Sequence, residues 1–370
     1  MPSTRGAPPP TNTPTARNRP AAGAVSARPA GALTLTTKDF KSDQEVRWCP
    51  GCGDYAILAA VQSFMPELGI PRERTVFVSG IGCSSRFPYY MNTYGLHSIH
   101  GRAPAIATGL SVSRPDLSVW VVTGDGDALS IGGNHLIHAL RRNVNLTILL
   151  FNNKIYGLTK GQYSPTSELG KITKSTPAGS ADSPFNPLSL ALGAEATFVA
   201  RTIDSDRKHL QSVLRAAAEH NGSAFVEIYQ NCNIFNDGAF EPLKDAGLRD
   251  DYLIRLEHGQ PITFGAQGQW CVVHPPGGFG LEVRETATVP VGEIVVHDAT
   301  VAEPAYAFAL SRLPGEDLRH TPIGVFRSVT RPTYDNLVQS QLERARANAS
   351  GTAEEQLAGL LTSGDTWTIT

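Results

Sequence analysis

The sequence predicts an α/β fold in which a parallel sheet carries helices on both faces. Leu117–Thr123 and Leu146–Phe151 are almost entirely apolar, as expected for parallel strands that are buried on both sides. Gly133–Arg142 lies between them and has the pattern of a helix. The three segments form a strand–helix–strand unit of about 30 residues, which returns the chain to the same edge of one sheet.

The same alternation of helix and strand extends over the region from residue 43 to residue 237. Apolar residues recur at helical spacing between residues 57 and 68, and Asp206–His220 has a second apolar helix face. Thr75–Ser79 and Ala224–Tyr229 are short β-branched or apolar runs, which are typical of strands. Alternating elements of this kind imply a parallel sheet between two helical layers.

Three regions are expected along the chain: a tail over residues 1–42, the α/β domain over residues 43–237, and an extension over residues 238–370. The first 32 residues contain no acidic residue and many prolines. A transit peptide is rich in Arg and poor in acids, but the prolines argue against an amphipathic helix, so we expect a disordered tail. Beyond residue 237 we expect an irregular extension, with short strands in Glu282–Asp298 and one polar helix in Pro332–Asn348.

Composition excludes several classes of function. The net charge of -2 gives no reason to expect nucleic acid or an anionic membrane as a partner. No apolar run approaches the roughly 20 residues of a membrane span. Five cysteines in 370 residues do not make a disulfide scaffold, and in a cytoplasmic protein a C-x-x-C pair with distant partners is more typical of a metal or redox site. We therefore expect a cytoplasmic protein.

Polar residues follow both strands of the central unit. Gly124-Asp125-Gly126-Asp127 comes directly after the first strand, and Asn152-Asn153 ends the second. Glycine allows the close approach of a ligand, and a helix that begins near Gly132-Gly133 would offer free N–H groups to a phosphate. Magnesium prefers oxygen ligands. Asp125, Asn153, a backbone carbonyl near Ile155 and diphosphate oxygens would supply them.

Four cysteines form a second set of candidate ligands. Cys49 and Cys52 make a C-x-x-C pair, whereas Cys83 and Cys232 each follow a predicted strand. Four thiolates suit either a structural zinc or an iron–sulfur cluster, and the residues alone leave both open. Ligands gather at the carboxyl ends of parallel strands, so the metal should lie beside the diphosphate site. Cys271 remains, and we interpret it as a small buried hydrophobic residue.

Together these motifs resemble the β subunit of 2-oxoacid:ferredoxin oxidoreductases, and Gly124-Asp-Gly…Asn152-Asn153 resembles the magnesium–diphosphate motif of thiamine diphosphate enzymes. The matching stretches are Trp48–Asp54, Gly80–Ser85, His100–Arg102, Gly124–Gln162 and the approach to Cys232. The resemblance covers about residues 43–237. It implies a thiamine diphosphate-binding module of the diphosphate-binding (PP) type, followed by the extension.

The resemblance also implies roles for individual residues. A [4Fe–4S] cluster would be held by Cys49, Cys52, Cys83 and Cys232, and Mg²⁺ by Asp125, Asn153 and Ile155. Thiamine diphosphate would contact a larger set, which comprises Gly82, Ser84, His100, Gly124, Asp125, Gly126, Asp127, Asn153 and Ile155. Arg86, Leu158 and Lys160 would meet the substrate.

The reaction implied is the oxidative decarboxylation of a 2-oxoacid, with coenzyme A as acyl acceptor and ferredoxin as electron acceptor. Thiamine diphosphate is bound between two modules, and the sequence contains only the diphosphate-binding one. A separate α subunit should therefore complete the site, in an (αβ)₂ heterotetramer. The positive charges of Arg86 and Lys160 favour 2-oxoglutarate, which has a second carboxylate.

Other functions remain open on sequence grounds. The enzyme could use pyruvate or a broad range of 2-oxoacids. A non-oxidative thiamine decarboxylase or carboligase with a structural zinc is a second class, and a non-catalytic regulatory paralogue is a third. The presence of Asp125, Asn153 and all four cysteines argues against the third.

Overall fold

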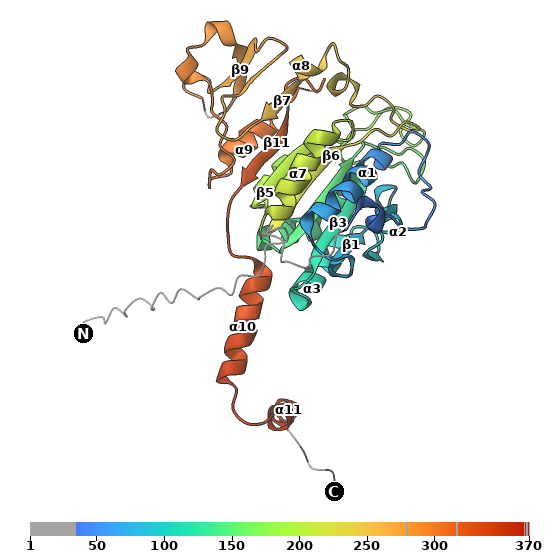
Figure 1. Cartoon of the computed structure of the whole chain (residues 1–370), viewed down its shortest axis with the longest axis vertical. Coiled ribbons are helices and arrows are strands. Elements are labelled where there is room, and N and C mark those ends of the chain that lie inside the picture. The colour runs from blue at the N-terminus through green and yellow to red at the C-terminus, as the bar shows by residue number, and fades with distance from the viewer. Residues whose placement is uncertain (1–34, 279, 316, 366, 368, 370) are drawn as a thin grey trace, which may run out of the picture.

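The computed structural model describes residues 35–278, 280–315, 317–365, 367 and 369. Its centre is an eight-stranded sheet with the order β2-β1-β3-β4-β6-β5-β11-β7 (Figure 1). Neighbouring strands are parallel except β11 and β5, which are antiparallel. The sheet consists of β1 (Thr75–Ser79), β2 (Tyr94–His97), β3 (Ser118–Gly124), β4 (Leu146–Asn152), β5 (Phe198–Ile203), β6 (Ser223–Tyr229), β7 (Leu253–Leu256) and β11 (Thr321–Ser328).

Helices cover both faces of this sheet, which confirms the predicted fold class. The described helices are α1 (Asp54–Phe64), α2 (Phe87–Tyr90), α3 (Ala103–Ser113), α4 (Asp125–Leu129), α5 (Gly133–Arg142), α6 (Pro187–Gly193), α7 (Arg207–Glu219), α8 (Arg249–Tyr252), α9 (Ala305–Ser311), α10 (Tyr334–Asn348) and α11 (Ala353–Leu361). α1 and α7 pack on one face, and α3, α5, α6 and α9 pack on the other.

The alternation of side chains along each strand divides the core into these two layers. In β3, Val119 and Val121 face the layer of α3 and α5, whereas Trp120 and Val122 face the layer of α1 and α7. All four side chains are buried, because successive residues of a strand point to opposite faces and both faces are covered. This is why the strands are apolar without an alternating pattern.

The extension adds more to the sheet than its sequence indicates. β7 and β11 lie beyond residue 237 and occupy one edge of the main sheet. A separate three-stranded antiparallel sheet with the order β10-β9-β8 stands beside them; it consists of β8 (Thr263–Phe264), β9 (Trp270–Val273) and β10 (Glu282–Glu285). Cys271 is fully buried there, as predicted.

The C-terminal helices lie apart from the compact body. α10 and α11 project away from it (Figure 1), and α10 coincides with most of the predicted polar helix. Residues 1–34 of the predicted tail lie outside the described residues. Of the helices that are described, none combines the length and the apolarity that crossing a membrane requires.

One buried asparagine joins the α/β domain to the extension. Asn143 caps α5 in the left-handed conformation, with φ of 54°. Its Oδ1 accepts hydrogen bonds from Thr197 Oγ1 at 2.6 Å and from the Ser223 N–H at 2.9 Å. Its Nδ2 donates to the carbonyl oxygen of Arg331 at 3.0 Å. A single side chain therefore holds the starts of β5 and β6 against the segment before α10.

Asn143→Ala is expected to lower the free energy of unfolding by about 2–4 kcal/mol, because it leaves several buried polar groups unpaired. Urea unfolding of the purified protein would measure the change. Asn348→Ala, at the exposed end of α10, is the matched control and should change stability by less than about 0.5 kcal/mol. Equal effects of the two variants would contradict this role for Asn143.

Candidate functional site

Four neighbouring strands bring the predicted ligands to one edge of the sheet. β1, β3, β4 and β6 are adjacent and parallel. Cys83, Asp125, Asn153 and Cys232 follow these four strands in that order. Carboxyl ends of adjacent parallel strands form a common edge, so residues from widely separated parts of the sequence meet there.

A cavity at this edge is lined by all nine residues that were predicted to contact the cofactor. Leu158 and Cys83 also line it, whereas Arg86 and Lys160 do not. The nine residues are Gly82, Ser84, His100, Gly124, Asp125, Gly126, Asp127, Asn153 and Ile155. The cavity measures only about 80 Å³, against about 300–1,000 Å³ for typical cofactor sites. This chain therefore presents one wall of a site and does not enclose it.

The Asp125 carboxylate lies at the start of α4, directly after β3, and is almost completely buried. Its Oδ2 accepts hydrogen bonds from Ser164 Oγ at 2.5 Å and from Thr166 Oγ1 at 2.6 Å. Burial raises the pKa of Asp125 to about 6, although these two hydroxyls oppose the rise. The hydroxyls orient the carboxylate through one oxygen, so the other can be presented to a cation.

Ser164 and Thr166 were not predicted as site residues. They belong to the segment 156–187, which is rich in Gly, Ser, Thr and Pro, and the only available signal was that a loop this long is usually functional.

The helix that was expected to bind phosphate through its start at Gly132-Gly133 lies farther from the cavity than predicted. α4 comes between β3 and that helix, and Gly132 does not line the cavity, so the helix start beside the cavity belongs to α4.

Asp127 lines the cavity, but its carboxylate is occupied by the protein itself. Oδ1 accepts hydrogen bonds from the Gly101 N–H at 2.7 Å and the Ile81 N–H at 3.1 Å, and it lies 2.7 Å from His100 Nδ1. Oδ2 accepts from Thr123 Oγ1 at 2.7 Å. Asp127 therefore ties together the loops after β1 and β2 and the end of β3, which fixes the shape of the cavity wall.

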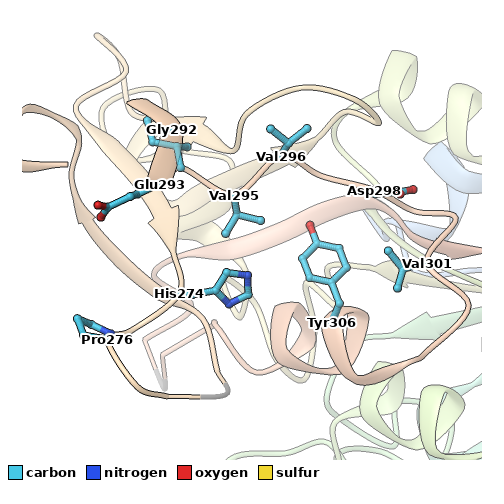
Figure 2. Close-up of a pocket in the computed structure, with 10 residues that line it drawn as sticks. His274, Pro276, Gly292, Glu293, Val295, Val296, Asp298, Val301 and Tyr306 are labelled. Carbon is cyan, nitrogen blue, oxygen red and sulfur yellow. The ribbon is translucent and has the colours of Figure 1, made fainter. Parts of the chain in front are cut away.

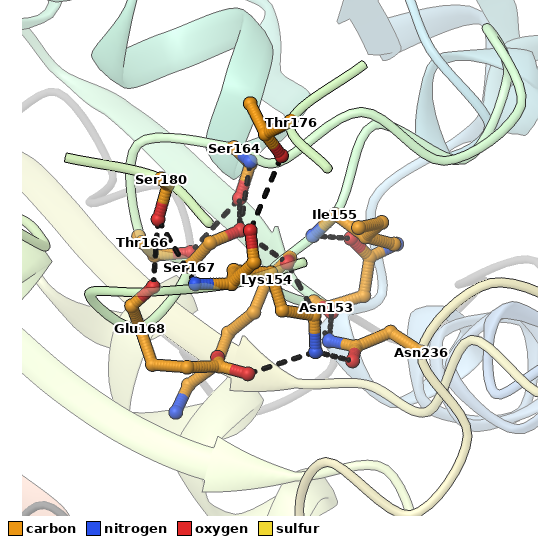
Figure 3. Close-up of polar contacts among 11 residues, drawn as sticks. Asn153, Lys154, Ile155, Ser164, Thr166, Ser167, Glu168, Thr176, Ser180 and Asn236 are labelled. Atoms are coloured by element: carbon orange, nitrogen blue, oxygen red, sulfur yellow. Dashed lines mark hydrogen bonds and ion pairs between the residues drawn. The ribbon is translucent and has the colours of Figure 1, made fainter. Parts of the chain in front are cut away.

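The turn after β4 is held from three sides (Figure 3). Asn153 Oδ1 accepts the Ile155 N–H at 3.2 Å. Lys154 has φ of 55°, an unfavourable value for a residue with a side chain, and its carbonyl oxygen accepts from Ser167 Oγ at 2.7 Å. Asn236, which lies four residues after Cys232, donates to the Asn153 carbonyl oxygen at 2.9 Å. The turn is thus fixed both to the long loop and to the segment that carries a cysteine.

Two of the four cysteines, Cys83 and Cys232, lie beside a glycine at the same edge of the sheet. A Cβ at Gly157 would lie 3.3 Å from Cys83 Sγ and 3.7 Å from Cys232 Sγ. Cys232 is buried, Cys52 and Cys83 are partly buried, and Cys49 is exposed. Burial raises the pKa of Cys83 to about 12 and that of Cys52 further still. Thiols in such surroundings need a metal to become thiolates.

The spacing of the thiols bears on which metal they fit. Within the described ranges, no three His, Cys, Asp or Glu side chains lie close enough together to hold one metal ion. A zinc site requires four ligands about 2.3 Å from a single ion, whereas each cysteine of an iron–sulfur cube binds a different iron. Gly157, which has no side chain, leaves room beside the sulfur atoms of Cys83 and Cys232.

A roomier cavity lies in the extension, away from these residues (Figure 2). It is lined by His274, Val295, Asp298 and Tyr306, among others, and by none of the predicted site residues. His274 bonds within its own loop at 3.2 Å, and the Tyr306 hydroxyl is 3.0 Å from His297 Nδ1. These polar groups are already paired, so the cavity has no evident chemistry.

Comparison with known proteins agrees with the geometry at the sheet edge. Residues 80–228 match the family model described as "Thiamine pyrophosphate enzyme, C-terminal TPP binding domain". The chain is 67% identical over 332 residues to the 2-oxoglutarate oxidoreductase subunit KorB of Mycobacterium tuberculosis, covering 90% of this chain and 88% of that one. It is 48% identical over 210 residues to the β subunit of 2-oxoacid:ferredoxin oxidoreductase 1 of Aeropyrum pernix, covering 57% and 64%.

A solved structure matches over nearly the whole fold. It is the 2-oxoglutarate:ferredoxin oxidoreductase from Magnetococcus marinus with 2-oxoglutarate, coenzyme A and succinyl-CoA bound. The TM-score is 0.70 and the identity is 35%, and the match covers 89% of this chain and 97% of the other. The similarity thus includes the extension as well as the α/β domain.

Gly157→Ala is expected to lower the metal content of the purified protein several-fold, because the added methyl group would crowd the sulfur atoms of Cys83 and Cys232. Metal analysis and the absorption of the purified protein would measure the loss. Gly193→Ala is the control, since a Cβ there meets nothing within 4 Å. Full metal content in Gly157→Ala would show that the cluster lies elsewhere, and one zinc per chain in the unsubstituted protein would revive the zinc hypothesis.

Proposed function

The chain belongs to the β subunits of 2-oxoacid:ferredoxin oxidoreductases, and on this premise we propose that it catalyses, with an α subunit, the oxidative decarboxylation of 2-oxoglutarate to succinyl-CoA and carbon dioxide. Coenzyme A would be the acyl acceptor and ferredoxin the electron acceptor. The observation that carries the proposal is the convergence of Asp125, Asn153, Cys83 and Cys232 at the ends of four adjacent strands. The substrate is supported by similar proteins that are named as 2-oxoglutarate enzymes, among them the two described above.

The residues around Asp125 fit a magnesium–diphosphate group. We assign Asp125, the Asn153 side chain and the Ile155 carbonyl as ligands of Mg²⁺, since all three residues line the cavity and offer the oxygen atoms that Mg²⁺ prefers. Ser164 and Thr166 would keep Asp125 in position. When bound, thiamine diphosphate would supply the electron sink for decarboxylation. The chain's own contribution is to anchor the diphosphate and hold the cofactor in place.

The four cysteines would hold a [4Fe–4S] cluster as the electron outlet. Gly157 adjoins two of the sulfur atoms and also lines the cofactor cavity, so the two groups would lie on either side of one backbone segment. The runner-up, a non-oxidative enzyme with structural zinc, would have no use for this proximity. Electrons leaving the cofactor need a short path to the cluster, and the position of Gly157 provides it.

A partner subunit would close the open side of the site. The cavity is too small to enclose the cofactor, and exposed apolar side chains stand near its mouth. Ile99 and Ile131 are 76% and 54% exposed, and they flank the contact between Gly101 and Gly132 beside His100. Exposed apolar groups around an incomplete site are typical of a protein interface. We place the α subunit there, in an (αβ)₂ heterotetramer that works in the cytoplasm.

Three residues are assigned to the substrate. Leu158 lines the cavity, and Arg86 follows Cys83 and Ser84 in the turn after β1. Arg86 Nε donates to the Tyr90 hydroxyl at 3.0 Å, which leaves the other guanidinium nitrogens for a carboxylate. Lys160 is exposed on the loop after Asn153. We propose that Arg86 and Lys160 meet the distal carboxylate of 2-oxoglutarate once the α subunit is bound. We also retain residues 43–237 as the catalytic domain and residues 238–370 as its extension.

The test of this function is a coenzyme A-dependent dye-reduction assay of the α/β complex against a panel of 2-oxoacids. We expect 2-oxoglutarate to be preferred, and Arg86→Ala to raise its KM by about 10–100-fold, the size of a lost charge-assisted hydrogen bond. The KM for pyruvate, which lacks the second carboxylate, should change little, and Arg86→Lys should retain part of the effect.

Three results would count against the proposal. A preference for pyruvate over 2-oxoglutarate would overturn the substrate assignment. Equal increases in the KM for 2-oxoglutarate and for pyruvate in Arg86→Ala would show that Arg86 does not bind the distal carboxylate. The substrate assignment would then depend on the 2-oxoacid preference of the unsubstituted complex. Turnover by the isolated chain without a partner would contradict the need for an α subunit.

Ile131→Asp is expected to weaken association with the α subunit by about 10-fold or more, because a charge would be buried at an apolar contact. Sedimentation or size-exclusion chromatography of the two co-expressed subunits would measure it. Val291→Asp, an 83% exposed apolar residue in the extension, is the control. Assembly of Ile131→Asp with wild-type affinity would place the partner on another surface.

A further inference from the structure

A fully buried ion pair lies behind the cofactor site and has no role in the function as described so far. Arg201 on β5 and Glu227 on β6 are direct neighbours in the sheet register. Arg201 Nε donates to Glu227 Oε2 at 2.7 Å, and both side chains have at most 2% of their surface exposed. Buried ion pairs commonly add little stability compared with apolar residues of the same volume. Stability alone therefore does not account for the ion pair, and its remaining contacts indicate which groups it orients.

The second carboxylate oxygen of Glu227 faces the end of β4. Glu227 Oε1 accepts a hydrogen bond from Asn152 Nδ2 at 2.7 Å. Because a carboxylate accepts and does not donate, this contact decides which way the Asn152 amide is turned. Its Oδ1 must then point away from Glu227, toward the turn that carries Asn153.

Asn152 Oδ1 lies at the junction of two parts of the cation site. It accepts the Lys154 N–H at 3.1 Å, and it lies 2.9 Å from Thr166 Oγ1. Thr166 Oγ1 lies between this oxygen and Asp125 Oδ2, and its single proton is shared between the two acceptors. The first contact supports the left-handed backbone at Lys154, which sets the direction of Asn153. The second places the hydroxyl that orients Asp125. One amide group thus acts on both side chains assigned to Mg²⁺.

The far side of Arg201 is closed by the extension. The Phe326 ring on β11 lies 5.7 Å from the guanidinium carbon, and the Tyr229 ring lies 4.9 Å from it. Arg201 Nη1 is 3.5 Å from the Pro322 carbonyl oxygen, also on β11. Strand β11 therefore packs against the arginine and shields its guanidinium group from solvent. This gives the extension a direct physical connection to the cofactor site.

We propose that the Arg201–Glu227 ion pair is a positioning device for the Mg²⁺ site, which acts by fixing the Asn152 amide and, through it, the Lys154 turn and the Thr166 hydroxyl. Arg201 and Glu227 touch neither cofactor nor substrate; they are positioning residues. The proposal rests on the proposed function, in that Asp125 and Asn153 are taken as the ligands of Mg²⁺.

The decisive variant removes the charges and keeps the packing. Arg201→Met/Glu227→Leu replaces the ion pair with apolar side chains, so the melting temperature should be unchanged or higher. Asn152 loses its partner, however. We expect the half-saturating Mg²⁺ concentration to rise by about 10–100-fold, the usual effect of losing an outer-shell partner of a metal ligand. A purely structural role for the pair predicts wild-type Mg²⁺ binding whenever the fold is retained.

The measurement uses the α/β complex after removal of its cofactor. The complex is dialysed against fixed thiamine diphosphate at a series of Mg²⁺ concentrations, and protein-bound thiamine diphosphate is measured along with the melting temperature. Thr197→Val is the matched control: it removes a buried hydroxyl that bonds to Asn143 at 2.6 Å, just before β5 begins and at the opposite edge of the sheet. It should alter stability but not the Mg²⁺ dependence.

Asn152→Ala tests the route of the effect. It should raise the half-saturating Mg²⁺ concentration to the same degree, and adding it to the double variant should have no further effect, because the pair acts through Asn152. If the double variant fails to fold, Arg201→Met/Glu227→Met, which also lacks an acceptor oxygen for Asn152, takes its place in the same cycle. Independent, additive effects of the pair and Asn152 would overturn the proposal, as would wild-type Mg²⁺ dependence in the double variant.

Asp125→Ala separates this inference from the function on which it rests. Loss of Mg²⁺-dependent binding in Asp125→Ala, together with a wild-type double variant, would refute the positioning role alone. Wild-type binding in Asp125→Ala would refute the cofactor site itself. The expected result is loss of binding in Asp125→Ala and a shifted Mg²⁺ dependence in the other two variants.

Discussion

The parallel arrangement of β1, β3, β4 and β6 is the constraint on which the whole site depends. All four strands end at the same edge of the sheet, so the residues that follow them in sequence lie near one another there. Candidate ligands separated by up to about 150 residues in sequence are brought to one edge by the strands, and hydrogen bonds such as that from Asn236 to the Asn153 carbonyl oxygen then join their segments. The apolar layers on both faces keep this sheet rigid, so the positions of the strand ends are set by the core and not by the ligands.

Two carboxylates two residues apart show how local surroundings divide the work at this edge. Asp125 and Asp127 both lie in the short helix α4 and are equally buried. The Asp127 carboxylate accepts hydrogen bonds from two backbone N–H groups and a threonine hydroxyl, so both of its oxygen atoms are engaged in joining loops. Asp125 receives two hydroxyls on one oxygen and keeps the other for a ligand. The sequence predicts cofactor contacts for both, and the structure places both in the cavity wall with different hydrogen-bond partners.

What could be predicted from the sequence follows from how local each feature is. The strand β1 and the helix α5 have the predicted bounds, since their patterns are contained within a few residues. The cavity wall was also predictable, because its residues lie in short motifs directly after strands. Ser164, Thr166 and the Arg201–Glu227 pair were not, because their roles depend on partners 26 to 41 positions away. A serine in a long loop or an arginine in a strand has no periodicity that indicates its partner.

The placement of β11 was hidden for the same reason, and it explains why a charged pair can persist in the core. β11 lies between β5 and β7, antiparallel to β5 and parallel to β7, with Gly324 opposite Arg201. A Cβ at Gly324 would lie 2.8 Å from the carbonyl oxygen of Leu256 on β7, and its φ of 119° is one that residues with a Cβ rarely adopt; glycine therefore lets β11 fit between its two neighbours. An arginine at this position without Glu227 would be an unpaired buried charge, and Glu227 without Asn152 would have one oxygen unused. Each of these buried polar groups is paired because the next one is present. The series of contacts runs from Arg201 through Glu227, Asn152 and Thr166 to Asp125, which lines the cavity.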